Sequence, residues 1–273
     1  MATNYRADGA KGVNTNRQRS LVTDQLKRSD LWSVMCLQAW LWAGVRDSDM
    51  GFELLAPHEW MEERVLSHLQ QQGFINGERN IEAPTQRSLN DPGHRWRLNE
   101  ELGELLEAGS LTNQALEELR DGPMFLSAVR EAWHTLATAE VVAYLAAELS
   151  DHGFDANWAW RLVPQIELAV PRISISEGFY MCWLAVRDIA SAYLRFPNSR
   201  DRLPHVLSHA LEAKLQKVRR KAWRTSPFAR HRRCSESAMA AVFSTAVTQL
   251  NDRYLLLAPS DMPWLEITQP ESR

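Results

Sequence analysis

The segment that most constrains the fold of this chain is SISEGFYMCWLAVRDIASAYLRF, residues 174–196. Ser174 and Glu177 have the spacing of a capping box, in which the two residues satisfy free backbone amides at a helix start. Pro197 marks the end of the predicted helix. A helix that is apolar around most of its girth must be covered by other elements. We therefore predict that this segment is the central helix of a helical domain, with Trp183 buried.

The tryptophans support a large apolar core. The chain contains 11 of them, and most fall inside helical patterns. Large rings in such positions are typical of core side chains. The tryptophans in helical patterns are Trp133, Trp158, Trp160, Trp183 and Trp223.

Several further features predict a soluble, cytoplasmic protein. No window holds about 18 uninterrupted apolar residues, the length that a membrane-spanning helix requires. The first residues show no apolar stretch typical of a secretory signal. Cys36, Cys182 and Cys234 stand far apart without a CxxC pair, which favours a reducing compartment. The sequence also lacks a Gly-rich phosphate loop, a nucleophile elbow and an HExxH motif, so we expect no cofactor and no metal.

Hydrophobic periodicity and stop signals divide the chain into short elements. Residues 1–22 are polar and rich in Gly and Asn, so we expect disorder there, and residues 259–273 look irregular. Phe74-Ile75 begins an extended segment, and the alternating residues 94–98 indicate a second strand. Helices are predicted over 24–44, 57–72, 99–108, 112–121, 123–152, 157–170, 174–196, 204–224 and 235–257.

The formal net charge of −3 hides a strong asymmetry. Residues 213–235 contain nine basic residues and no acid, whereas the rest of the chain is acidic. This segment predicts a cationic ridge formed by a helix and the loop after it, able to bind nucleic-acid phosphates. The alternatives are an acidic surface of a partner protein, a solvated face, or pairing with this chain's own acidic helices at 100–107 and 117–121. The basic residues are Lys214, Lys217, Arg219, Arg220, Lys221, Arg224, Arg230, Arg232 and Arg233.

The order of elements from about residue 25 to 108 resembles the back half of a winged-helix domain. In that family a helix ending in a GFI-like sequence precedes a two-stranded wing, whose second strand runs into a last helix. The resemblance implies that Arg64 and His68 on the recognition helix, with Arg95 and Arg97 on the wing, read nucleic acid. The matching residues are Val65, Leu66, Leu69, Gly73, Phe74, Ile75, Trp96, Arg97, Leu98, Asn99, Leu102, Gly103, Leu105 and Leu106.

Two features depart from the winged-helix pattern. The helix that should precede the recognition helix is indistinct between Ser48 and Ala56. The recognition helix itself begins with Glu59, Glu62 and Glu63, whose charges repel phosphates. An acidic recognition helix is suited instead to docking a protein.

Two histidine patterns suggest weaker hypotheses. Arg200 and His205 have the spacing of the motif in HEPN-type ribonucleases, a resemblance that implies action on a phosphodiester. In that family the motif lies within one helix, whereas Pro204 interrupts it here. His205 and His209 are four residues apart, as in some metal sites, but only Glu212 is a candidate third ligand.

Together these patterns predict a mainly α protein, with a winged-helix-like domain and small β-wing over 23–109 and an all-α domain over 110–258. The first expected function is non-catalytic binding of nucleic acid, DNA before RNA, as a regulator or component of a bacterial complex. The alternative is a protein-binding adaptor or structural subunit of a multiprotein assembly, and a ribonuclease comes third. The target sequence, the partner and the oligomeric state stay open.

Overall fold

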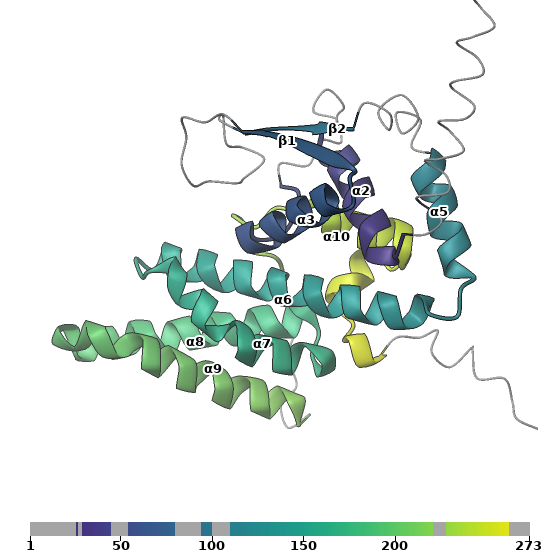
Figure 1. Cartoon of the computed structure of the whole chain (residues 1–273). Coiled ribbons are helices and arrows are strands. Elements are labelled where there is room, and N and C mark those ends of the chain that lie inside the picture. The colour runs from purple at the N-terminus through teal and green to yellow at the C-terminus, as the bar shows by residue number, and fades with distance from the viewer. Residues whose placement is uncertain are drawn as a thin grey trace, which may run out of the picture.

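The computed structural model describes Leu26 and residues 29–44, 54–79, 94–99, 110–220 and 228–261. Within these residues the protein is mainly helical, with one small antiparallel sheet (Figure 1). This agrees with the predicted mainly α class. The predicted N-terminal tail, residues 262–273 of the C-terminal tail, most of the predicted helix at 99–108 and the end of the helix at 204–224 lie outside the described residues.

The N-terminal half follows the predicted order of helices and strands. The segment after helix α3 begins with Gly73, whose φ of +74° suits glycine at a helix end. The two strands pair antiparallel, with Ile75 opposite Leu98 and Gly77 opposite Trp96. Gly77 has a steric role, because a Cβ atom there would lie 2.8 Å from the Trp96 ring. The elements are α2 (Leu31–Gly44), α3 (Glu59–Gln71), β1 (Ile75–Arg79), β2 (His94–Leu98) and α5 (Ser110–Arg120).

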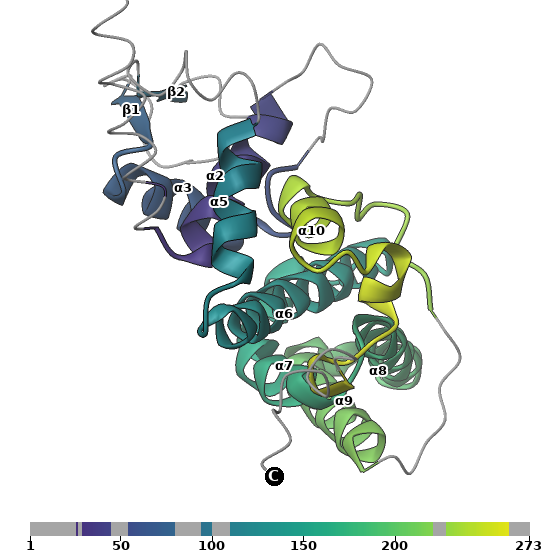
Figure 2. The ribbon, with the colours of Figure 1, turned by 90° about the vertical axis from the view of Figure 1, so that its right-hand side faces the viewer.

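The central helix of the molecule is α6 (Phe125–Asp151), a 27-residue helix. It runs between α2, α3 and α10 on one side and α7, α8 and α9 on the other (Figures 1 and 2). Its side chains are buried almost continuously from Leu136 to Leu145. The prediction that residues 174–196 form the central helix is therefore wrong, because α6 is covered on more sides.

The segment predicted to be central forms α8 (Ile175–Arg195), whose capping box is confirmed. The Glu177 backbone N–H donates to Ser174 Oγ at 3.1 Å, and the Ser174 N–H donates to Glu177 Oε2 at 2.8 Å. Gly178 permits close approach to α6, since a Cβ there would lie 2.6 Å from Val141 Cγ2. Trp183 is only half-buried, because the outer side of α8 remains exposed to solvent.

Helix α9 (Leu203–Arg219) packs antiparallel against α8 after the short 3-10 helix η3 (Pro197–Arg202). An ion pair between Lys214 and Asp188 joins the two helices. Before α8, the single helix predicted at 157–170 is instead divided at Pro164, which has no backbone N–H to continue a helix. The segments are η1 (Ala156–Leu162), α7 (Val163–Ala169) and η2 (Val170–Arg172).

The continuous helix predicted over 235–257 is also wrong. After α10 (Ala238–Ala241) the backbone forms a π-helix, η4 (Val242–Val247), and Gln249 and Asn251 then adopt positive φ angles of 56° and 48°. Thr248 Oγ1 donates to the Phe243 carbonyl at 2.8 Å, which offers the backbone an alternative to regular helix bonding. Two 3-10 helices follow, η5 (Asn251–Leu255) and η6 (Pro259–Asp261).

One hydrophobic core joins the N-terminal and C-terminal parts of the chain. The backbone amides of Ala238 and Met239 donate to the carbonyls of Leu54 and Leu55, so α10 is tied to the segment before α3. The boundary predicted at residue 109 stays a prediction. Among the described residues, no helix has both the length and the apolarity needed to cross a bilayer.

Candidate functional site

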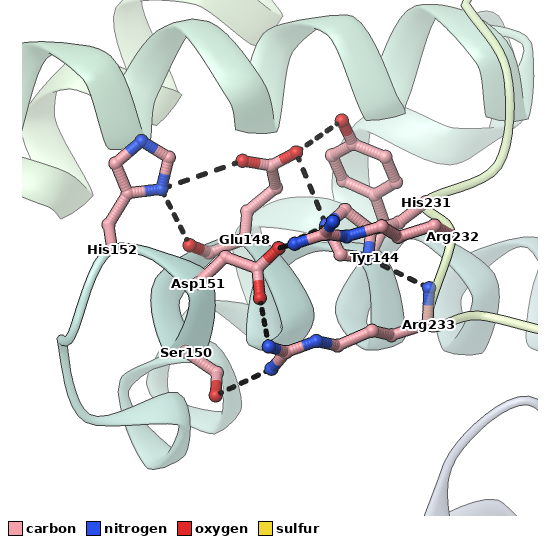
Figure 3. Close-up of polar contacts among 8 residues, drawn as sticks. All are labelled: Tyr144, Glu148, Ser150, Asp151, His152, His231, Arg232 and Arg233. Atoms are coloured by element: carbon pink, nitrogen blue, oxygen red, sulfur yellow. Dashed lines mark hydrogen bonds and ion pairs between the residues drawn. The ribbon is translucent and has the colours of Figure 1, made fainter.

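Charged and polar side chains gather where residues 228–237 lie along α6, a region named here the α6 junction. Helix α6 contributes Glu140, Tyr144, Glu148 and Asp151, which lie on one face because they are three or four residues apart. The loop contributes a run of four basic side chains, and Figure 3 shows three of them pointing at the carboxylates near the end of α6. The loop residues are Arg230, His231, Arg232 and Arg233.

The Asp151 carboxylate pairs with three of these side chains. Arg233 Nη2 lies 2.7 Å from Asp151 Oδ1, while Arg232 Nη2 and His231 Nε2 each lie 3.1 Å from Oδ2 (Figure 3). Desolvation raises the pKa of Asp151, but the hydrogen bond from Arg232 and the charges of the basic side chains outweigh it. The net pKa of Asp151 is therefore lowered, and the group is a carboxylate at neutral pH.

Glu148 lies one turn earlier and accepts a hydrogen bond of 2.8 Å from the Tyr144 hydroxyl. Its carboxylate oxygens also lie 3.8 Å from His152 Nδ1 and 3.9 Å from His231 Nε2. Burial, followed by the hydrogen bond and charge of Glu148, raises the pKa of Tyr144 above its ordinary value. Tyr144 therefore acts here as a hydrogen-bond donor.

Arg230 reaches further along α6 and forms a buried ion pair with Glu140, whose side chain is 2% exposed. Glu140 Oε1 and Arg230 Nη2 are both buried without a hydrogen-bond partner among the described residues. Burial raises the pKa of Glu140, and the charge of Arg230 opposes that shift. Such a pair is sensitive to the loss of either member, since the remaining charge would be buried without compensation.

The thiols near the junction are not activated as nucleophiles. Burial, assisted by the charge of Glu140, raises the pKa of Cys234 to about 11. Burial likewise raises the pKa of Cys182. A reactive cysteine requires a lowered pKa, so these groups suit a structural role.

The residues of the predicted cationic ridge that the structure describes differ in their surroundings. Arg230, Arg232 and Arg233 pair with carboxylates of α6, whereas Lys214 pairs with Asp188 of α8. Lys217 and Arg220 are exposed at the end of α9, and only the backbone of Arg219 is described. Lys221 and Arg224 lie outside the described residues.

The described acidic partners of the loop lie on a helix that the hypothesis of internal pairing did not name. That hypothesis named 100–107, which lies outside the described residues, and 117–121, whereas the observed partners are Glu140, Glu148 and Asp151 of α6. A signal for them was present in the sequence. Glu140, Tyr144 and Glu148 are four residues apart in an otherwise apolar helix, and buried polar groups in such a helix require partners.

The residues predicted on the recognition helix face a cleft of about 440 Å³ between α3 and the first half of α6. The Arg64 guanidinium lies 5.7 Å from the centre of the Trp32 ring, and His68 Nε2 lies 2.8 Å from Ser33 Oγ. Burial lowers the pKa of His68, which favours the neutral ring at neutral pH. Helix α6 therefore forms the opposite wall to the face of α3 that was predicted to read DNA.

The predicted wing residues occupy β2. Arg97 is exposed and lies opposite Asn76 of β1, while Arg95 lies opposite Glu78 in the register. The sheet is confirmed as a two-stranded antiparallel pair. Its use as a DNA-binding wing stays a prediction.

The ribonuclease-like pair is divided between two elements. Arg200 lies in η3 and donates to the Gly153 carbonyl at 3.3 Å, whereas His205 lies in α9 beyond Pro204. His205 and His209 are both exposed. The described residues contain no cluster of three side chains that could bind a metal ion.

A second cleft, of about 410 Å³, lies between the start of α3, the middle of α6 and Arg233. His58 lines it and stands edge-on to Trp160, with ring centres 4.6 Å apart. Burial lowers the pKa of His58 from 6.5 to about 4. The folded protein thus resists protonation of this ring at a pH where the unfolded chain accepts a proton.

Acidification is therefore expected to destabilise the protein through His58. The contribution of His58 is fully present above pH 6.5 and is lost as the pH falls toward 4. The largest loss of stability that His58 can cause is about 3 kcal/mol, because one pKa unit corresponds to about 1.4 kcal/mol. Urea unfolding at about pH 7.5 and about pH 5 should show a smaller stability loss for His58→Asn than for the unmutated protein. The control His205→Asn alters an exposed ring, and equal pH dependence in all three proteins would contradict this assignment.

No family model, curated protein or solved structure matches this chain.

Proposed function

We propose that this protein is a non-catalytic adaptor that binds another protein through the end of α8. The observation that carries the proposal is the exposure there of two large apolar side chains, Leu194 at 82% and Phe196 at 66%. Single exposed apolar residues are common on proteins, whereas concentrations of them are typical of interaction sites, and these two are only two residues apart in the chain. This region, named here the α8 tip, comprises Leu194, Arg195, Phe196, Arg200 and Arg202.

The α8 tip rests on a supported base. Tyr193 meets Phe154 edge-on with ring centres 6.1 Å apart, and Phe154 stacks on Trp158 at 5.8 Å. The ion pair between Asp188 and Lys214 joins α8 to α9, and Val206, the fourth residue of α9, is itself 37% exposed. Anchor residues bind best when their surroundings are ordered before the partner arrives.

Nucleic-acid binding remains the second candidate, and one observation weakens it. The arginines of residues 230–233 are engaged by α6 carboxylates, and contact with phosphate would compete with those ion pairs. The salt-dependent affinity expected of a cationic ridge comes from cations that exchange their counterions for phosphates. Fewer such cations are available on the described surface than the sequence predicts.

A comparison of tagged variants in a native lysate tests the proposed function. We expect the unmutated protein to retain specific proteins after nuclease treatment, and the variant Leu194→Ser with Phe196→Ser to lose them. Met124→Ser is the matched control, because Met124 is 70% exposed and lies just before the start of α6, outside the α8 tip. Retention of the same proteins by the tip variant would refute the proposal, as would complete loss of the partners on nuclease treatment.

A further inference from the structure

The α8 tip combines exposed apolar side chains with arginines. Arg195 ends α8, and Arg200 and Arg202 lie in η3, all three exposed. Asp201 is the only acidic residue from 194 to 206. Arg195, Arg200 and Arg202 form no ion pair with a carboxylate among the described residues, unlike Arg230, Arg232 and Arg233 at the α6 junction.

Arg200 is held in place without losing its charge, and a further arginine, Arg187, lies on the same helix as Arg195. Arg200 Nη2 donates to the Gly153 carbonyl at 3.3 Å, which anchors η3 to the end of α6. Two turns before Arg195, the Arg187 guanidinium lies over the Trp183 ring at 4.5 Å. Neither contact neutralises the guanidinium. Cationic groups therefore flank the apolar tip along about 12 Å of helix, at a rise of about 1.5 Å per residue.

We propose that the α8 tip recognises an acidic amphipathic segment of a partner protein. Apolar side chains of that segment cover Leu194 and Phe196, while its carboxylates pair with Arg195 and Arg202. Carboxylates suit arginine because the two groups form parallel, charge-assisted hydrogen bonds. This inference rests on the proposed adaptor function and names the chemistry of its partner.

The apolar residues favour a protein over a nucleic acid as the occupant. Leu194 is the most exposed large apolar side chain described, and its aliphatic side chain, unlike the ring of Phe196, offers a base no surface on which to stack. An amphipathic helix can place its carboxylates on the arginines while burying its apolar face.

A designed peptide tests this recognition directly. The probe is a fluorescent helical peptide of about 16 residues, with Leu and Phe three and four residues apart and Glu on the flanks. In anisotropy titrations with the full chain, Arg195→Glu with Arg202→Glu should weaken binding at least about tenfold. Arg130→Glu is the matched control on the exposed surface of α6 and should leave the affinity unchanged. A second peptide with Lys in place of Glu should prefer the Arg195→Glu, Arg202→Glu variant.

This reversal of preference distinguishes recognition from a loss of folding, because a misfolded variant would bind neither peptide. The acidic-segment proposal is overturned if the unmutated protein fails to bind the acidic peptide or if the charge reversal leaves its affinity unchanged. It is also overturned if single-stranded RNA or duplex DNA competes with the peptide and binds the α8 tip with higher affinity than the peptide does. Self-association that depends on Phe196 would assign the tip to a second copy instead. Failure of the peptide, with tip-dependent retention of lysate proteins intact, would reject the acidic partner and keep the adaptor function.

Discussion

Replacing Glu140 with alanine is expected to lower the free energy of unfolding by about 3–5 kcal/mol. The change leaves Arg230 without its main carboxylate partner, while its side chain remains 16% exposed. Glu236 compensates little, since its Oε1 lies 3.9 Å from Arg230 Nη2 and its side chain is 47% exposed. Urea unfolding followed by circular dichroism measures the loss. A large loss identifies the attachment of residues 228–237 to α6 as part of the folded framework.

Two variants separate the buried pair from the rest of the α6 junction. Glu140→Leu combined with Arg230→Met should recover most of the lost stability, because apolar side chains of similar size avoid the cost of burying charges. Arg232→Ala should cost at most about 1 kcal/mol, because this surface ion pair is largely solvated and the Arg232 side chain is 78% exposed. If Glu140→Ala costs no more than Arg232→Ala, the structural role assigned to the buried pair is wrong.

Replacing Trp133 with alanine is also expected to cost about 3–5 kcal/mol. Its ring is fully buried in α6 and contacts Phe243 and Tyr254, with ring centres 5.8 and 6.0 Å apart. The substitution opens a cavity where α6 meets the irregular C-terminal segment. Chemical unfolding should therefore show that this aromatic cluster stabilises residues 242–255 on α6.

Trp183→Ala provides the comparison, since Trp183 is half-buried and packs on Phe228 with ring centres 5.6 Å apart. We expect it to cost less than Trp133→Ala, because less apolar surface returns to water. Trp133→Phe should also cost less than the alanine substitution. Its ring fills most of the site, and the lost indole N–H has no hydrogen-bond partner among the described residues. A larger loss for Trp183→Ala would restore α8 as the central helix.

Local sequence rules predicted the helices whose ends carry their own signals. Ser174 and Glu177 specify the start of α8 through contacts within four residues, so no distant part of the chain is needed. Gly73 similarly marks the end of α3, and the alternating residues 94–98 form β2 as predicted. The same rules failed over 235–257. Gln249 and Asn251 adopt positive φ angles there although neither residue is a glycine, so the sequence contains no signal for them.

The sequence by itself determined most of the helical segments and the place where positive charge is concentrated. Only the tertiary structure decided how that charge is used, because Arg230 and Glu140 are 90 residues apart and meet through packing. Periodicity shows that one face of α8 is apolar, but the number of neighbouring helices decides whether that face is covered. Leu194 near the end of α8 and Phe196 just after that helix are exposed, so this end of the segment is not covered by the packing. Burial depends on contacts between distant segments, and local patterns alone do not specify those contacts.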